Sequence, residues 1–170
     1  MEKKNEVENY LRVRNFKNPE FFTKREDWDN YFMEVAILVS KRSTCSHRQV
    51  GAIIVKEKRI LATGYNQPPS GFPHCDVIGC IRDDLKIKSG EYQEICYGLH
   101  AEQNALMQAA KFGISTDNAS MYVTHQPCSV CARLIINAGI KEVYYTKSYP
   151  DSLTKMFFET CNIKTKIIGN

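Results

Sequence analysis

Apolar positions recur with a helical period in four stretches of the chain. The first runs from Asp29 to Ser40, with apolar residues three and four positions apart, and Asp27 or Asp29 is placed to cap its first turn. Gly113 and Gly139 follow two of the other stretches, at positions where helices commonly end. The other three helices are predicted at residues 99–112, 127–138 and 152–160. In the helix at 99–112 the residues expected to face the core are Ala105, Leu106, Ala109 and Ala110.

Short apolar runs between these helices have the length and composition of buried β-strands. Residues 50–55 and 59–64 flank the polar turn Lys56-Glu57-Lys58, which predicts a hairpin. Later strands are predicted at residues 119–124, 141–146 and 163–168. Because helices and strands alternate after the hairpin, their order indicates parallel strands joined by crossover helices, with helices on both faces of one sheet. The pattern therefore predicts an α/β fold.

Two segments depart from this rhythm. Residues 1–28 are polar and lack sustained periodicity, so they are predicted to form an N-terminal arm outside a folded domain that spans residues 29–170. Residues 65–97 hold three of the six prolines and lie inside the domain. Segments of this length without regular structure are usually functional or held in place by other contacts.

Length and composition narrow the class of protein. A chain of 170 residues, 43% hydrophobic and 25% charged, suits one globular domain with a single core. The net charge of +4 is compatible with an anionic partner but does not require one. No run approaches the roughly 18 apolar residues of a membrane helix, so no membrane partner is expected.

The cysteine content bears on location. The polar N-terminus has no apolar region of the kind that marks a secretory signal. Seven cysteines in such a chain indicate metal ligands or free thiols in a reducing compartment. The expected location is therefore the cytoplasm.

Two short motifs carry the residue types of a catalytic zinc site. His100-Ala101-Glu102 is followed, 25 residues after the glutamate, by Pro127-Cys128-Ser129-Val130-Cys131. His100, Cys128 and Cys131 can supply three ligands to zinc and leave the fourth position open for water. Glu102 is then free to move protons. This pattern is the signature of zinc-dependent nucleobase deaminases.

The same residues allow two interpretations. In the catalytic one, hydroxide formed at the zinc attacks the amidine carbon of an aminopyrimidine or aminopurine, and Glu102 carries protons to the ring nitrogen and the leaving amine. In the other, the zinc is structural and closed, with Glu102 as its fourth ligand, and the protein is a binding module without catalytic activity.

Six stretches of the chain together carry a family resemblance. They are Arg42-Ser-Thr-Cys45, Val50-Gly-Ala52, Gly64-Tyr-Asn66, His100-Ala-Glu-Gln-Asn-Ala105, Met121-Tyr-Val-Thr-His-Gln-Pro-Cys128 and Ala138-Gly-Ile-Lys-Glu-Val143. On these residues the chain resembles the deoxycytidylate (dCMP) deaminases, particularly their bacterial and phage members, from about residue 29 to residue 168. The zinc motifs are shared with the wider superfamily, whereas Asn104, the Gly64-Tyr-Asn66 loop and the cysteine-bearing segment are typical of the nucleotide enzymes.

The resemblance implies hydrolysis of dCMP to dUMP and ammonia by attack at C4 of cytosine, a step that feeds thymidylate synthesis. It also implies a three-layer α/β/α cytidine deaminase-like fold with a central five-stranded mixed sheet, assembled as a homohexamer. By position, Asn66 would contact the sugar, Ala101 would offer backbone contacts to the base, and Glu102 would be the proton shuttle. The other substrate-binding residues expected are Asn104, Lys111, which would hold the phosphate, and Tyr145.

A second, structural zinc is implied as well. Phage relatives bind it with cysteines at the positions of Cys45 and Cys75, and their other ligands are absent here. Cys80 and Cys96 are expected to complete a four-cysteine site, with His74 in reserve. Such a site would hold residues 65–97 against the end of the first helix.

The resemblance also bears on how the protein is regulated and which substrates are possible. Family members are often activated by dCTP and inhibited by dTTP, so these nucleotides are the expected effectors. The family usually has glycine after the Gly-Tyr-Asn triplet, where this chain has Gln67. Alternative substrates within the superfamily are a tRNA adenosine, a free nucleoside such as cytidine, or a riboflavin precursor. A nucleic-acid substrate usually requires a clustered basic surface, and the lysines here are scattered, so no nucleic-acid partner is expected.

Overall fold

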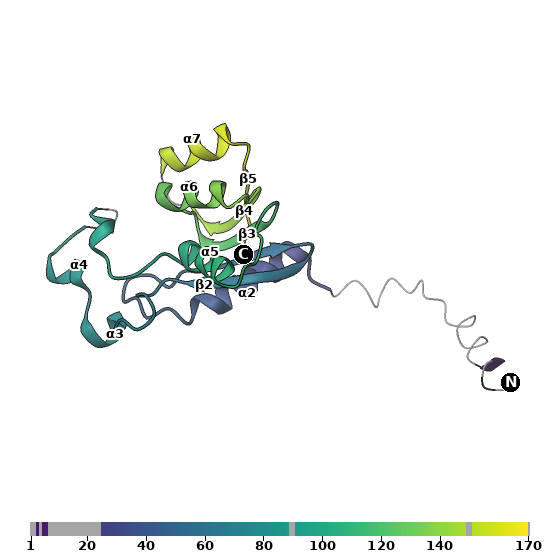
Figure 1. The fold of residues 1–170 in the computed structure, drawn as a ribbon, viewed down its shortest axis with the longest axis horizontal. Helices are drawn as coiled ribbons and strands as arrows, with labels where there is room; N and C mark the ends of the chain where they lie inside the picture. The colour runs from purple at the N-terminus through teal and green to yellow at the C-terminus, as the bar shows by residue number, and fades with distance from the viewer. Residues whose placement is uncertain (1–2, 4, 7–24, 89–90, 149–150, 170) are drawn as a thin grey trace.

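A five-stranded sheet forms the centre of the computed structural model, which describes residues 3, 5, 6, 25–88, 91–148 and 151–169 (Figure 1). The strand order is β2-β1-β3-β4-β5. The strands are β1 (Gly51–Lys56), β2 (Arg59–Tyr65), β3 (Ser120–His125), β4 (Glu142–Lys147) and β5 (Lys164–Ile167). Of the N-terminal arm expected at residues 1–28, only residues 3, 5, 6 and 25–28 are among those described.

The sheet is mixed, as the resemblance implied. Strand β1 is antiparallel to both β2 and β3, whereas β3, β4 and β5 run parallel. The strands that helices join, β2 to β5, all run in one direction, as the helix–strand alternation predicted, and β1 is antiparallel to β2, as the predicted hairpin requires. Strands β2 and β3 do run in the same direction, as a crossover helix requires, but β1 lies between them. The hairpin makes β1 antiparallel to β2, so it is antiparallel to β3 as well.

Helices cover both faces of the sheet, so the three-layer prediction is confirmed. Helix α2 (Trp28–Ser40) packs its buried residues Phe32, Met33 and Ala36 on one face. Residues of α5 (Ala101–Lys111), α6 (Ser129–Asn137) and α7 (Ser152–Thr160) form a second apolar cluster on the opposite face. In the described residues, no helix is both long and apolar enough to cross a membrane.

The helix boundaries follow from local chemistry. Asp27 caps α2, because its side chain accepts hydrogen bonds from the backbone N–H groups of Asp29 and Asn30 at 2.9 and 3.1 Å. In α5 the predicted core residues Ala105, Leu106 and Ala109 are buried, but Ala110 is exposed. The apolar stripe of α5 is thus narrower than the pattern suggested.

The segment between β2 and α5 projects from the domain, and its two ends are paired where they leave it and return. Gln67 and Leu99 pair at its base, each donating its backbone N–H to the other's carbonyl oxygen, at 3.3 and 2.8 Å. The segment is not without regular structure, because it contains α3 (Cys75–Ile78), α4 (Ile81–Asp84) and a 3₁₀ turn at Gln93–Ile95. Figure 1 shows α3 and α4 projecting away from the sheet. We call residues 68–98 the insert.

Candidate active site

The three predicted zinc ligands lie at the beginnings of two helices. His100 is the N-cap of α5, and its backbone N–H donates to the side-chain oxygen of Gln103 at 2.8 Å. Cys128 is the N-cap of α6, and Cys131 lies in the first turn of that helix. Pro127 precedes them, after β3 has ended. Helix α5 and the β3–α6 connection therefore bring the two motifs together.

The geometry of these three side chains fits zinc. The Nδ1 atom of His100 lies 3.5 Å from the sulfur of Cys128 and 3.4 Å from that of Cys131. A tetrahedral zinc with Zn–N and Zn–S bonds of about 2.0 and 2.3 Å would separate the nitrogen from each sulfur by about 3.5 Å. The ligand atoms of all three residues lie within 4.8 Å of one another. The donor set is therefore already close to the arrangement that the metal requires.

The pKa values of the two thiols also favour a bound cation. Hydrogen bonds from Cys131 and His100 lower the pKa of Cys128 to about 4. The same contact with Cys128, together with burial, raises the pKa of Cys131 strongly. The pocket by itself thus favours one thiolate, and a second thiolate requires a bound cation to balance its charge. Hydrogen bonding to Cys128 also raises the pKa of His100, against the opposing effect of burial.

Glu102 lies beside this cluster in a nearly dry environment. Its side chain is 4% exposed. Burial raises its pKa, although the neighbouring His100 opposes the shift. A carboxyl group with a raised pKa can both accept and return a proton near neutral pH.

The first residues of α7 form hydrogen bonds with the backbone on both sides of Cys128. Asp151, the N-cap of α7, accepts hydrogen bonds from the backbone N–H groups of Thr154 and Ser129 at 3.0 and 2.9 Å. These bonds lower the pKa of Asp151 despite the opposing effect of partial burial. The fully buried hydroxyl of Thr154 donates to the carbonyl of Pro127 at 3.2 Å. The start of α7 therefore holds the residues on both sides of Cys128.

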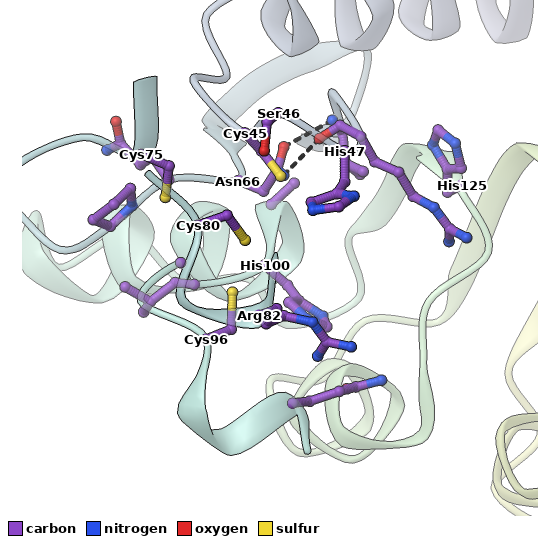
Figure 2. Close-up of a pocket in the computed structure, with 18 of the residues that line it drawn as sticks. Cys45, Ser46, His47, Asn66, Cys75, Cys80, Arg82, Cys96, His100 and His125 are labelled. Atoms are coloured by element: carbon purple, nitrogen blue, oxygen red, sulfur yellow. Dashed lines mark hydrogen bonds between the residues drawn. The ribbon is translucent and has the colours of Figure 1, made fainter. Parts of the chain in front are cut away.

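A cleft of about 360 Å³ lies over His100, Glu102 and Cys128, between the sheet and the insert (Figure 2). That volume suits a small-molecule ligand. The charges around it are asymmetric, because among the described residues that line it Glu102 is the only carboxylate. The lining residues that carry or can accept a positive charge are His47, Arg48, Arg82, His100 and His125.

Only some of the predicted substrate residues line this cleft. Ala101 and Asn66 do. The side-chain amide of Asn66 also closes its own loop, accepting from the N–H of Val50 and donating to the carbonyl of Arg48, both at 2.8 Å. Asn104 instead donates to the carbonyl of Tyr65 at 2.7 Å and so ties α5 to the end of β2.

Two further residues predicted to bind substrate, Lys111 and Tyr145, do not line the cleft, whereas Gln67, where the family usually has glycine, does. Lys111 is exposed at the far end of α5, with its ammonium over the ring of Phe112, and is not part of the cleft lining. Tyr145 packs against the core and does not line the cleft either. Gln67 does line it, and its backbone φ is not positive, so the position does not require the glycine that the family usually has there.

The four cysteines predicted to bind a second zinc all line the same cleft. Figure 2 shows their sulfur atoms turned toward a common space. Burial, followed by the charges of Cys45, Cys96 and Cys80, raises the pKa of Cys75, so the four are electrostatic neighbours. Among the described residues, however, the second compact group of ligand atoms is Cys80 with His47 and Asp83. The reserve ligand His74 lies 3.0 Å from the hydroxyl of Thr44 and outside the cleft lining.

Sequence reasoning missed the cationic residues of the cleft other than His100, and it missed the contacts of α7 with the residues beside Cys128. His125 lies inside the motif at residues 121–128, and Arg48 lies between the motifs that end at Cys45 and begin at Val50, so their position was a usable signal. Burial, followed by the charges of Lys147 and Arg48, lowers the pKa of His125. Asp151 and Arg82 carried no such signal, because each is separated from the motifs in sequence and reaches the site only through the fold.

Comparisons with known proteins agree with this geometry. The chain matches the family model described as MafB19-like deaminase over residues 26–170. It is 44% identical to ComE operon protein 2 of Bacillus subtilis over 74% of this chain and 62% of that protein. It is 37% identical to the deoxycytidylate deaminase of Mycobacterium phage D29 over 72% of this chain and 97% of that protein. Other relatives are longer, and the chain spans 46% of the deoxycytidylate deaminase of Schizosaccharomyces pombe.

A solved structure shows the same fold. The dCMP deaminase of cyanophage S-TIM5, crystallised in complex with dCMP and dUMP, superposes with a TM-score of 0.70 at 33% sequence identity. The match covers 85% of this chain and 98% of the phage chain.

Proposed function

This chain belongs to the MafB19-like deaminase family, and on that basis we propose that it is a zinc-dependent enzyme that hydrolyses dCMP to dUMP and ammonia. The observation that carries the proposal is the separation of 3.4–3.5 Å between Nδ1 of His100 and the sulfurs of Cys128 and Cys131, with Glu102 buried beside them. The product dUMP would feed thymidylate synthesis.

Each residue has a defined part in the proposed reaction. His100, Cys128 and Cys131 would hold zinc, which lowers the pKa of a bound water to about 7 and so makes a nucleophile available at neutral pH. As the oxygen of a water at this site bonds to C4, the carboxylate of Glu102 would take one proton from it and pass that proton to the ring nitrogen of cytosine. It would then take the second proton of the same oxygen and deliver it to the amine, which leaves as ammonia when the C4–N bond breaks. Ala101 and Asn66 line the cleft and are proposed to contact the substrate.

The test is ammonia release by the purified zinc-loaded protein with dCMP, cytidine, a riboflavin-pathway aminopyrimidine and a tRNA stem-loop side by side. We expect dCMP to be the preferred substrate. Glu102→Gln should retain zinc but lose activity by about 10²–10⁴-fold, because the proton transfers are lost. Glu159→Gln, which removes an exposed carboxylate on α7, is the matched control and should behave like the unaltered protein.

Two outcomes would contradict the proposal. Preference for another substrate in the panel would reassign the reaction within the superfamily. Full zinc binding with no turnover of any substrate, and no effect of Glu102→Gln, would indicate a binding module with a structural metal instead.

We also propose a second zinc, held by Cys45, Cys75, Cys80 and Cys96. The four thiols face one space, which supports the proposal, but their ligand atoms do not yet form a compact set, so binding requires the insert to draw together. Metal analysis should give two zinc ions per chain, falling to one in Cys75→Ser. If instead Asp83→Asn loses the second ion and Cys75→Ser keeps it, the ligands are His47, Cys80 and Asp83.

The remaining proposals concern assembly, regulation and location. A homohexamer is supported by exposed apolar side chains on α5 and α6, where Met107 is 57% and Leu134 is 41% exposed. Light scattering would measure its mass. Activation by dCTP and inhibition by dTTP can be read in the ammonia assay. A cytoplasmic location is supported by the seven cysteines, all of which are free thiols in the structure.

A further inference from the structure

One cation in the cleft comes from the insert and has no assigned role. Arg82 lies on α4 and is half-buried. Figure 2 shows it next to His100, and both residues line the cleft. Its Nη2 atom donates to the carbonyl of Lys88, within the insert. This bond occupies one of the five N–H donors of the guanidinium.

Within the described part of the chain, Arg82 has no anionic partner. Among the described residues, no carboxylate lies within ion-pair distance of its guanidinium, whereas the ion pairs that do occur involve His47, Lys155, Lys164 and Lys166. The single carboxylate among the described lining residues, Glu102, is buried at the base of the cleft. A half-buried arginine beside an acid-poor cleft is thus available to an anionic ligand.

The insert is fastened in a way that keeps Arg82 over the cleft. Asp83, the next residue of α4, forms an ion pair with Nε2 of His47 at 2.8 Å. His47 belongs to the loop that precedes β1, so this pair connects the insert to the domain on the other side of the cleft. Gln67 and Leu99 close the base of the same segment. The His47–Asp83 pair and the Gln67–Leu99 pairing therefore keep the insert, and Arg82 with it, next to the cleft.

We propose that Arg82 determines specificity for nucleotides over nucleosides by binding the 5′-phosphate of the substrate. The planar guanidinium matches a phosphate group with two parallel N–H···O bonds, which an ammonium group cannot reproduce. The inference rests on the proposed function, because it assigns the phosphate of dCMP to a residue of the insert. It also gives the insert a direct part in substrate binding, beyond carrying cysteines.

The test compares Arg82→Gln and Arg82→Lys with the unaltered protein, using dCMP and deoxycytidine as substrates. Arg82→Gln should lower kcat/KM for dCMP by about 10- to 100-fold, the usual effect of losing a charge-assisted hydrogen bond, and leave deoxycytidine unchanged. Arg82→Lys should restore part of the loss. Arg133→Gln is the matched control, because Arg133 is exposed on α6 and donates to the carbonyl of Ser129 at 3.3 Å.

Calorimetric binding of dUMP and deoxyuridine separates this inference from the proposed function. Arg82→Gln should weaken dUMP binding by a similar factor without changing deoxyuridine binding. Equal losses for nucleotide and nucleoside, or no loss for dUMP and dCMP, would overturn the assignment while leaving dCMP deamination intact. If the unaltered protein binds dUMP through Arg82 but releases no ammonia from dCMP, the proposed function fails and the phosphate assignment stands.

Discussion

Gly64 in β2 sets how closely helix α5 approaches the sheet, so replacing it with alanine tests how the site is positioned. The new Cβ atom would lie 2.9 Å from Cα of Ala105, and closer still to the carbonyl oxygen of Ala101 and the backbone nitrogen of Ala105. Ordinary contact begins at 3.4 Å, so the contact with Cα alone requires α5 to move by 0.5 Å, and the two closer contacts require a larger movement. Backbone atoms of a packed helix cannot turn aside as a flexible side chain can.

The displacement should separate the two halves of the site, because Glu102 stands on α5 whereas Cys128 and Cys131 stand at the start of α6. A misplacement of about 1 Å costs roughly 100-fold in rate, so a shift of half to one ångström predicts a loss of about 10- to 100-fold in kcat/KM. Over-packing should also lower the free energy of unfolding by about 1–3 kcal/mol. In a chain of this size, that lowers Tm by roughly 2–12 °C.

Gly51→Ala is the matched control. Its Cβ atom would lie 2.5 Å from the backbone nitrogen of Ser40 and closer to the carbonyl oxygen of Ala36, both in α2 on the opposite face of the sheet. It should therefore lose similar stability without moving α5. Gly98→Ala, whose Cβ would make only ordinary contacts from 3.7 Å, should be tolerated. Ammonia release, zinc retention on dialysis and thermal unfolding are measured together. If Gly64→Ala and Gly51→Ala lose activity equally, the approach of α5 is not what positions the site.

Two further variants test the contacts of α7 beside Cys128 and the face packed against α2. Asp151→Ala removes the cap of α7 and should cost about 1–2 kcal/mol, seen in calorimetry as a fall in Tm of about 2–8 °C; the exposed Asp84→Ala should not change Tm. Burial and a hydrogen bond to Glu142 raise the pKa of Tyr144 from 10.0 to about 12. Its protonated form thus contributes stability that is complete below pH 10 and is lost as the pH rises to about 12. Tyr144→Phe should flatten that decline in urea unfolding, and an unchanged profile would contradict the assignment.

The elements and the two halves of the metal site could be predicted from the sequence because their signals are local. A period of three and four residues places the apolar stripe of a helix, and the spacing of Cys128 and Cys131 puts both sulfurs on one turn. The same reasoning overestimated the width of the α5 stripe at Ala110, since periodicity does not reveal how far a neighbouring helix extends.

The strand order could not be read from that periodicity. Both edges of β1 are occupied, by β2 and β3, and nothing in the apolar run of β1 indicates which later strand fills its second edge. The alternation of helices and strands predicted the common direction of β2 to β5, and the hairpin predicted the opposite direction of β1, whereas the five-stranded mixed sheet came from the family resemblance.

By itself the sequence determined the order of the helices and strands outside the insert, the ligand types His100, Cys128 and Cys131, and a carboxylate two residues from the histidine. Only the tertiary structure decided which cationic side chains surround the predicted metal site. Arg82 is 18 positions before His100, yet the closed base of the insert and the His47–Asp83 pair return it to the cleft. The physical reason is that backbone hydrogen bonding and apolar periodicity act over a few residues, whereas proximity across the cleft depends on how distant segments pack.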